Sequence, residues 1–465
     1  MKKRLLLHIL PAVIAIACFA LAAADSATDR PNVILIYTDD QGTVDMNCYG
    51  AKDLYTPNMD SLAAGGIRFT QFYAAAPVCS PSRAALMTGN SPFNAGVPRN
   101  SGHFYGNPLG MPTGQYTFAE MMRDAGYTTG HIGKWHLGYV DEKMPLAQGF
   151  DHSFGHMGGC IDNYSHFYYW SGPNRHDLWE NGKEIYRPGE FFLDMMEEEA
   201  HEFIWDNRDR PFFLYCAINM PHYPLQGKPE WLKYYEDLPT PRREYAAFIS
   251  TIDEAVGRLT DYLEALGLTE NTIIIYQSDH GHSNEERTFG GGGSAGPYRG
   301  SKFSLFEGGI RTPAIISWKG HIDPGQVRDQ AGFNVDWMPT VAELCGIDIP
   351  GQVIDGKSLV PIIRDPKAEA QHSEFFWHYP SVTMHKGEAQ WAVRRGPWKL
   401  IANGVDRSGT REPLDPEKDK YFLVNFNVDP TETQNLAREN PGMVEELTRL
   451  HDEWFSGVEK RMKAE

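Results

Sequence analysis

The sequence of 465 residues predicts an α/β fold, in which a doubly wound, mostly parallel sheet is flanked by helices and followed by a smaller C-terminal subdomain with an antiparallel sheet. Two patterns predict it. Short runs of consecutive apolar residues, typical of parallel strands buried on both faces, alternate with helical segments over most of the chain. Near the C-terminus, strand-like runs follow one another without a helix between them. We therefore expect a main domain at residues 25–365 and a subdomain at residues 366–465.

Residues 1–24 are expected to be a signal peptide and not part of the fold. Basic residues at positions 2–4 precede an apolar stretch at residues 5–21, and three alanines end it. The apolar stretch is short for a membrane span, so we expect cleavage near Ala24 and no stable membrane anchor. The signal looks bacterial, which predicts a periplasmic or secreted protein. Lipidation at Cys18 remains an alternative, although the residues before it resemble a lipobox poorly.

The charge of the chain excludes some partners. The formal net charge is −18, which does not suit nucleic acid or an anionic membrane surface. A polyanionic substrate would need a local basic pocket against this field. Aromatic residues make up 12% of the chain, which fits either a protein that stacks on sugars or an aromatic-rich core.

The elements of the main domain follow from hydrophobic patterns. Apolar runs predict strands at residues 33–37, 127–132, 212–218, 273–276 and 314–318. Helical periodicity predicts helices at residues 117–125 and 245–266, ended by Gly126 and Gly267. Strands that alternate with helices in this way favour a doubly wound sheet, in which ligands bind beyond the carboxyl ends of the strands.

Four of the predicted strands end in residues that carry chemistry. The residues that follow them are Asp39 and Asp40, Lys134 and His136, His222, and Asp279 and His280. If these strands are neighbours, their ends converge on one crevice. Three carboxylates cannot share a site without a cation, so the set predicts Ca²⁺ or Mg²⁺, and the histidine nitrogen would also tolerate Mn²⁺. The alternative is that these are ordinary turn residues.

The stretch APVCSPSRAALMTGN, at residues 75–89, predicts a short helix with a cysteine at its start. Ser80 is expected as the N-cap and Pro81 in the first turn, and Gly89 ends the helix. Cys79 would then lie at the positive end of the helix dipole, near Arg83, where a thiolate is stabilised. Five cysteines follow residue 24, and this odd number points to one special thiol. Five inert thiols, or a hydrolase that uses the Cys79 thiolate, remain open alternatives.

The same residues resemble a known family. Cys79-Ser80-Pro81-Ser82-Arg83, followed by Thr88-Gly89, resembles the C-x-P-x-R…T-G motif of type I sulfatases, which belong to the alkaline phosphatase superfamily. The segment GYTTGHIGKWHLG at residues 126–138 resembles the second motif of that family. The acidic strand ends match the metal ligands of the family in order. The resemblance covers nearly the whole chain from Asn32 onward.

The resemblance implies a role for each matching residue. It implies that Cys79 is oxidised to formylglycine by a formylglycine-generating or anaerobic maturating enzyme, and that residues 25–365 form the catalytic domain. It implies that Asp39, Asp40, Asp279, His280 and position 79 hold Ca²⁺, with Mg²⁺ or Mn²⁺ as alternatives. It further implies that Lys134 and Lys302 hold the sulfate, that His222 protonates the leaving alcohol, that His136 assists release of the sulfate, and that Arg83 orders the nucleophile. Many members have asparagine where this chain has His280, which leaves the identity of the metal open.

The substrate is expected to be a sulfated carbohydrate. Beyond a linker predicted at residues 361–371, the strand-like segments EFFWHYP, QWAVRRGPWKLI and KYFLVNFNVDP and an amphipathic helix at residues 442–462 form the subdomain. Candidate sugar contacts are Trp377 and His378 here, and Asp162 and Asn163 in a polar-aromatic loop; packing between subdomains is the alternative for the aromatic pair. Two rival functions remain: a phosphate or phosphonate monoester hydrolase of the same superfamily, and a non-catalytic sugar-binding relative.

Overall fold

The structure, a computed structural model, describes residues 30–102, 106–169, 174–351, 354–385, 387–409 and 411–464. The predicted signal peptide, its cleavage site and Cys18 lie outside the described residues. Within the described ranges, no helix is both long enough and apolar enough to cross a membrane.

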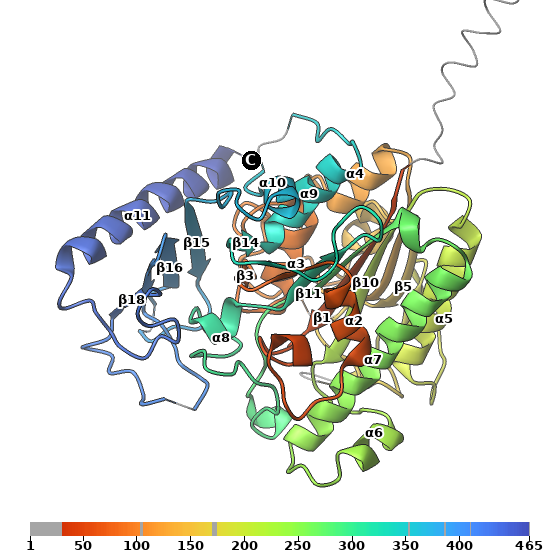
Figure 1. Cartoon of the computed structure of the whole chain (residues 1–465), viewed down its shortest axis with the longest axis horizontal. Coiled ribbons are helices and arrows are strands. Elements are labelled where there is room, and N and C mark those ends of the chain that lie inside the picture. Colours follow the sequence, from red (N-terminus) through yellow and green to blue (C-terminus); the bar gives the residue numbers. More distant parts are fainter. Residues whose placement is uncertain are drawn as a thin grey trace, which may run out of the picture.

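A ten-stranded mixed sheet forms the centre of the main domain (Figure 1). Its order is β13-β2-β12-β11-β1-β10-β4-β5-β8-β9, and the five neighbouring strands from β11 to β5 are parallel. The strands are β1 (Asn32–Asp39), β2 (Ile67–Phe69), β4 (Thr128–Lys134), β5 (His152–His156), β8 (Trp179–Glu180), β9 (Lys183–Glu184), β10 (Phe212–Pro221), β11 (Thr272–Ser278), β12 (Ala314–Ser317) and β13 (Gln326–Arg328). All five strands predicted from apolar runs are present, which confirms the predicted fold class.

Helices cover both faces of the sheet because successive side chains of its buried strands point to opposite faces. Along β1, Ile34 and Ile36 pack into one apolar cluster with α2 (Pro57–Ala64), α5 (Phe192–Asn207) and α7 (Arg242–Ala265). Val33 and Leu35 pack into a second cluster with α3 (Cys79–Thr88), α4 (Phe118–Asp124), α9 (Trp337–Leu344) and α10 (Val360–Arg364). Figure 1 shows α5 and α7 side by side on one side of the molecule. The sheet is therefore doubly wound.

Residues at the helix ends explain where the two predicted helices, α4 and α7, begin or end. Helix α4 begins with a capping box, in which the Thr117 hydroxyl accepts the amide of Glu120 and the Glu120 carboxylate accepts the amide of Thr117. Gly126 and Gly267 follow α4 and α7 with positive φ angles of 89° and 71°, as a glycine after a helix end should.

The C-terminal subdomain contains the predicted antiparallel sheet. It has the order β15 (Glu374–Tyr379), β16 (Gln390–Arg395), β17 (Trp398–Ala402) and β18 (Tyr421–Asn425), and α11 (Pro441–Ala464) lies across it (Figure 1). The predicted linker is wrong at its start, since residues 360–364 form helix α10 with Ile362 and Ile363 buried in the main core. Two short pairs, β3 (Phe72–Tyr73) with β14 (Gly332–Phe333) and β6 (Phe167–Tyr168) with β7 (Arg175–His176), and the helices α6 (Pro229–Tyr234) and α8 (Glu307–Ile310) complete the regular structure.

A buried ionic cluster joins the subdomain to the main domain. The Lys399 ammonium on β17 lies 2.8 Å from a carboxylate oxygen of Glu307 on α8 and 2.9 Å from one of Glu432. All three side chains are fully buried.

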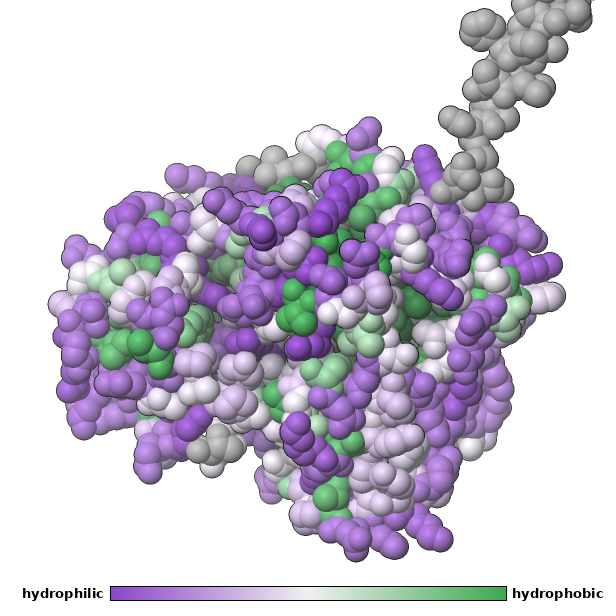
Figure 2. Space-filling model, viewed as in Figure 1, coloured by the Kyte–Doolittle hydropathy of each residue, from purple (hydrophilic) through white to green (hydrophobic). Residues whose placement is uncertain are grey.

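Hydrophilic residues dominate the face of the molecule in Figure 2, in keeping with the high net charge.

Candidate active site

The four strand ends singled out in the sequence lie next to one another. The strand order β11-β1-β10-β4 brings the residues after these strands to one edge of the parallel sheet. Asp39 ends β1, Asp279 and His280 follow β11, His222 follows β10 and Lys134 ends β4. Because parallel strands share the same carboxyl edge, one crevice receives all of these side chains.

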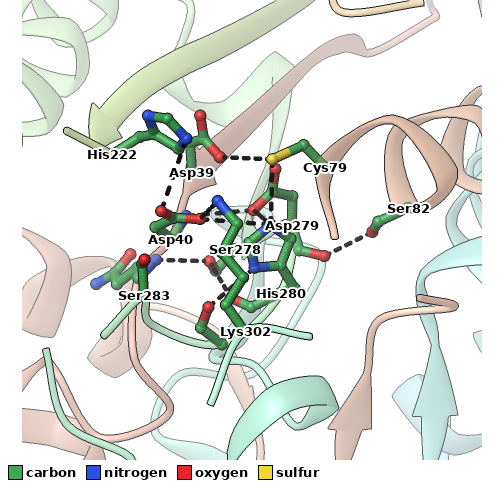
Figure 3. A network of polar contacts seen from close by, with 12 residues as sticks. Asp39, Asp40, Cys79, Ser82, His222, Ser278, Asp279, His280, Ser283 and Lys302 are labelled. Carbon is green, nitrogen blue, oxygen red and sulfur yellow. Dashed lines mark hydrogen bonds and ion pairs between the residues drawn. The ribbon is translucent and has the colours of Figure 1, made fainter. Parts of the chain in front are cut away.

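Cys79 lies at one side of this group, with its sulfur pointing toward the other labelled side chains (Figure 3). Its Sγ lies 3.3 Å from Nε2 of His280 and 3.5 Å from Oδ1 of Asp39. The side chain is 1% exposed. Burial raises the pKa of the thiol, but Lys134, Lys302 and His280 outweigh it and lower that pKa to about 6. The site therefore stabilises negative charge on the side chain at position 79.

The acidic residues form a group that could hold a cation. Ligand atoms of Asp39, Cys79, Asp279 and His280 lie within 4.8 Å of one another, and Asp39, Asp40, Cys79 and His222 form an overlapping group. Oδ2 of Asp40 is buried and has no hydrogen-bond partner, which is costly unless a cation or another ligand satisfies it. Nδ1 of His280 lies 2.9 Å from the carbonyl oxygen of Gly281, so a proton on Nδ1 leaves Nε2 available as a ligand.

Burial and neighbouring charges shift the pKa values of Asp40 and His280 in this group. Burial raises the pKa of Asp40 to about 7, although the Lys302 ammonium acts in the opposite direction. Burial lowers the pKa of His280, but Asp279, Cys79 and Asp40 outweigh it and raise that pKa to about 9. A bound divalent cation would replace protons as the charge that balances the carboxylates.

Arg83 contacts the carboxylate of Asp279 and not the thiol of Cys79. Its Nε and Nη2 lie 3.1 and 2.9 Å from the same Oδ2, and both side chains are fully buried. The Ser82 hydroxyl donates to the carbonyl oxygen of Asp279 at 2.6 Å. Two neighbouring residues on α3 therefore hold the end of β11 against the start of the helix that carries Cys79.

Each of the two predicted lysines contacts a different carboxylate. Lys134 Nζ is 2.5 Å from Oδ2 of Asp39, and Lys302 Nζ is 2.7 Å from Oδ1 of Asp40. Lys302 reaches the site from the loop before α8, as Figure 3 shows. The two ammonium groups thus provide positive charge at two points around Cys79, an arrangement suited to an anion with several oxygens.

His222 and His136 occupy the same edge of the sheet. His222 Nδ1 lies 2.9 Å from the carbonyl oxygen of Tyr223, while Nε2 lies 3.8 Å from Oδ2 of Asp40. Burial and then the charge of Lys302 hold the pKa of His222 well below its usual value. His136 has a positive φ of 56° and is buried, with its ring beside Gly159. A proton on Nδ1 of His222 leaves Nε2 as the atom that faces the crevice.

The start of α3 differs from the sequence prediction. The helix begins at Cys79, with Val78 as an N-cap that has no side-chain hydrogen bond, so Ser80 is not the cap. Instead, the amide of Ser80 donates to Oδ1 of Asn100, a partner 20 residues away that local sequence cannot reveal. The predicted end is confirmed, because Gly89 has a φ of 65°. None of the described cysteines forms a disulfide. Their odd number therefore does not mark Cys79 as the cysteine left over from disulfide pairs.

The candidate sugar contacts are not brought together. Asn163 is buried, where it accepts a hydrogen bond from Asn219, and Asp162 accepts one from Gln226. Trp377 is 1% exposed, and its indole donates to the carbonyl oxygen of Ala74. His378 points to the other face of β15, where its ring stacks on Phe455 of α11. The burial of Trp377 fits the packing alternative given for the aromatic pair, and Asn163 is also buried; a contact of these four residues with a sugar stays a prediction.

Comparisons with known proteins agree with this geometry. The model of the Sulfatase family matches residues 31–347, and that of the N-sulphoglucosamine sulphohydrolase C-terminal family matches residues 300–456. The chain belongs to the sulfatase family. Human arylsulfatase A is 33% identical to it over 93% of this chain and 89% of that protein. The rat N-acetylgalactosamine-6-sulfatase is 36% identical over 82% and 75% of the two chains.

A solved structure is similar over almost the same length. The crystal structure of Ps i-CgsB has a TM-score of 0.81 and 30% identity, and the match covers 91% of the sulfatase described here and 92% of that chain. That protein was also solved in complex with k-i-k-neocarrahexaose. These similarities identify the present sulfatase as a sulfuric ester hydrolase.

Proposed function

We propose that this sulfatase removes a sulfate group from a carbohydrate, with a formylglycine made from Cys79 and with a divalent cation, most simply Ca²⁺. The observation that carries the proposal is the position of Cys79 Sγ, within 3.5 Å of both Asp39 and His280 and in a group of cation-ligand type. Carbohydrate as the substrate class is supported by the neocarrahexaose complex of the similar structure and by the N-acetylgalactosamine-6-sulfatase relatives. Export to the periplasm or beyond, after cleavage near Ala24, is part of the same proposal.

The residues present fit the two groups that the family uses. Asp39, Asp40, Asp279 and His280 would hold the cation, since these oxygen-rich ligands suit Ca²⁺ and the single imidazole permits Mg²⁺ or Mn²⁺. The unpartnered Oδ2 of Asp40 is the atom that most needs such a partner. When present, formylglycine supplies an oxygen nucleophile and the cation supplies positive charge for the sulfate oxygens.

The chain's own residues can bind the ester and move its protons. Lys134 and Lys302 bind the sulfate oxygens from two sides and neutralise the charge that develops on them. Nε2 of His222 faces the crevice and donates a proton to the oxygen of the leaving alcohol. The negative charge of a bound sulfate opposes the effect of Lys302 on His222 and so favours the protonated ring. We place the second proton transfer, which accompanies release of the sulfate, at the ring of His136.

The test is a comparison of esters and variants. The matured enzyme with Ca²⁺ should hydrolyse 4-nitrophenyl sulfate with a kcat/KM well above that for 4-nitrophenyl phosphate. Cys79→Ala should lower kcat by about 10³-fold or more, as the loss of a nucleophile does, while Cys48→Ala controls for loss of a thiol. Chelation should abolish the activity and Ca²⁺ should restore it. A higher rate on the phosphate ester would instead favour the phosphate or phosphonate monoester hydrolase.

A further inference from the structure

A second cavity lies beside the active site and is not explained by the reaction. It has a volume of about 500 Å³ and is lined by Glu285, Glu286, Arg287 and Arg407. The first three residues follow β11 in the loop that begins at Asp279, whereas Arg407 comes from the C-terminal subdomain. Two of the four lining residues are glutamates and two are arginines, so in a chain with a net charge of −18 this cavity offers two guanidinium groups without an excess of negative charge.

The cavity adjoins the active site on the side of Lys302. The guanidinium carbon of Arg407 lies 5.1 Å from the centre of the Phe303 ring, and Nζ of Lys302 lies 5.8 Å from the same centre. On the other wall, burial raises the pKa of Glu285, but the charge of Lys302 and the hydrogen bond from Arg287 outweigh it, so that the pKa is lowered. A ligand in the cavity would therefore lie next to the lysine that we assign to the sulfate.

Arg287 is held in a fixed position. Its Nη2 lies 2.6 and 2.7 Å from the two carboxylate oxygens of Glu285. Its guanidinium carbon lies 4.2 Å from the centre of the Tyr223 ring, and Tyr223 is the residue after His222. A guanidinium group that is held by a carboxylate and an aromatic face has little conformational freedom left to lose when it binds an anion.

Arg407 offers its charge without a partner carboxylate. It is exposed, and it makes no ion pair with any residue in the described ranges. The loop that carries it is anchored, because the neighbouring Asp406 accepts a hydrogen bond from Nε of the buried Arg299 at 2.7 Å. The two arginines thus lie on the walls of one cavity, one from each domain.

We propose that this cavity is a subsite for a second anionic group, a sulfate ester or a carboxylate, on the same carbohydrate whose sulfate ester is cleaved at Cys79. The inference rests on the proposed function and adds the class of substrate: a glycan with at least two negative charges close together. Guanidinium groups bind both kinds of anion through paired hydrogen bonds. Because Glu285 and Glu286 balance the two arginines, the cavity has no excess positive charge. It should select one anionic group in a defined place and not polyanions in general.

The experiment measures affinity for three oligosaccharides by calorimetry in the Cys79→Ala background, which prevents turnover. The probes are hexasaccharides of kappa-carrageenan, with one sulfate per disaccharide, of iota-carrageenan, with two, and of chondroitin 6-sulfate, with one sulfate and one carboxylate. We expect at least one doubly charged probe to bind about tenfold more tightly than the kappa-carrageenan probe. Arg407→Gln and Arg287→Gln should each remove that preference. Arg208→Gln is the control, because Arg208 precedes β10 at the opposite edge of the sheet.

Each outcome decides the matter. A preference for the iota probe identifies a sulfate ester as the second group, and a preference for the chondroitin probe identifies a carboxylate. Equal affinity for all three probes, no binding to any of them, or a preference that survives both arginine substitutions would overturn the proposal. Hydrolysis of 4-nitrophenyl sulfate by the matured wild type is measured in parallel. If the wild type does not hydrolyse this ester but the binding preference is found, the result contradicts the proposed function and leaves the subsite supported.

Discussion

The side-chain amide of Gln390 donates a hydrogen bond to the carbonyl oxygen of Phe303 at 3.0 Å, and so ties the C-terminal sheet to the loop that carries Lys302. The same amide accepts the backbone N–H of Leu305 at 2.8 Å. Phe303 has a positive φ of 73°, which is strained for a bulky residue, and its own N–H donates to the carbonyl oxygen of Pro77, two residues before Cys79. Gln390 therefore helps to hold the loop of Lys302 next to the segment that carries Cys79.

Replacement of Gln390 should impair sulfate binding as well as stability. Gln390→Leu removes the side-chain partner of three backbone groups, the N–H of Leu305 and the carbonyl oxygens of Phe303 and Val382, at a cost of about 1–3 kcal/mol for each group left buried and unsatisfied. Release of the strained turn should displace Lys302, so we expect KM for 4-nitrophenyl sulfate to rise about tenfold. Gln148→Leu is the matched control, since Gln148 is buried far along the chain from the Lys302 loop and donates to Glu142. If both variants lose stability alike and keep the same KM, Gln390 has only a structural role.

Arg83 should not be replaceable by lysine. Two of its nitrogens contact one oxygen of Asp279, a geometry that a single ammonium cannot reproduce. We expect Arg83→Lys to lower kcat/KM about 100-fold with the fold retained, and Arg83→Met to cost about 3–5 kcal/mol of stability, because it leaves a buried carboxylate unpaired. Arg258→Lys, at the partly exposed pair with Glu197, is the control. Full activity of Arg83→Lys would show that charge alone suffices.

Stability should fall in mild acid because of a histidine inside the sheet. His131 on β4 is fully buried, and burial lowers its pKa to about 3. The folded state keeps this ring neutral while the unfolded chain binds a proton below its ordinary pKa of 6.5, so stability is lost as pH falls through that value. This histidine alone should cost about 2 kcal/mol between pH 7.5 and pH 5.

The variant His131→Gln isolates that contribution. Glutamine can keep a hydrogen bond to the hydroxyl of Ser153, the partner of His131. Urea denaturation measures the free energy of unfolding of both proteins at pH 7.5 and at pH 5. Between these pH values the wild type should lose about 2 kcal/mol more than the variant. His321→Gln, at an exposed histidine, should show no such shift. A pH-independent difference for His131→Gln would refute the assignment.

The ionic cluster between the domains should contribute far more to the stability of the protein than an ion pair at the surface does. Lys399→Met leaves the buried carboxylates of Glu307 and Glu432 without their shared cation, and we expect a loss of about 3–5 kcal/mol. Lys420→Met, which breaks an exposed pair with Glu388, should have little effect on stability, because solvent screens the pair. Thermal unfolding of both variants measures the contrast. Equal losses would mean that the cluster does not join the domains.

Local patterns predicted the strands, their chemical endings and the helix after Cys79, because each depends on residues that are close in sequence. The convergence of Asp39 and Asp279 also followed, since a parallel sheet has one carboxyl edge. Partners distant in the chain were not predictable. Neither Asn100, which binds the amide of Ser80, nor Gln390 carries a local signal. The sequence also left two roles open for Trp377, because a tryptophan that packs and one that stacks on sugar look alike in sequence, and its burial becomes visible only in the structure.

The mass of the tryptic peptide FTQFYAAAPVCSPSR, residues 69–83, from protein made in its native host shows whether position 79 carries formylglycine or a thiol. Formylglycine is about 18 Da lighter than cysteine. We predict that this loss is found at Cys79, and that cysteines elsewhere, such as Cys345, keep their full mass. If Cys79 remains entirely a thiol in active enzyme, the site does not work through formylglycine, and the thiolate alternative takes its place.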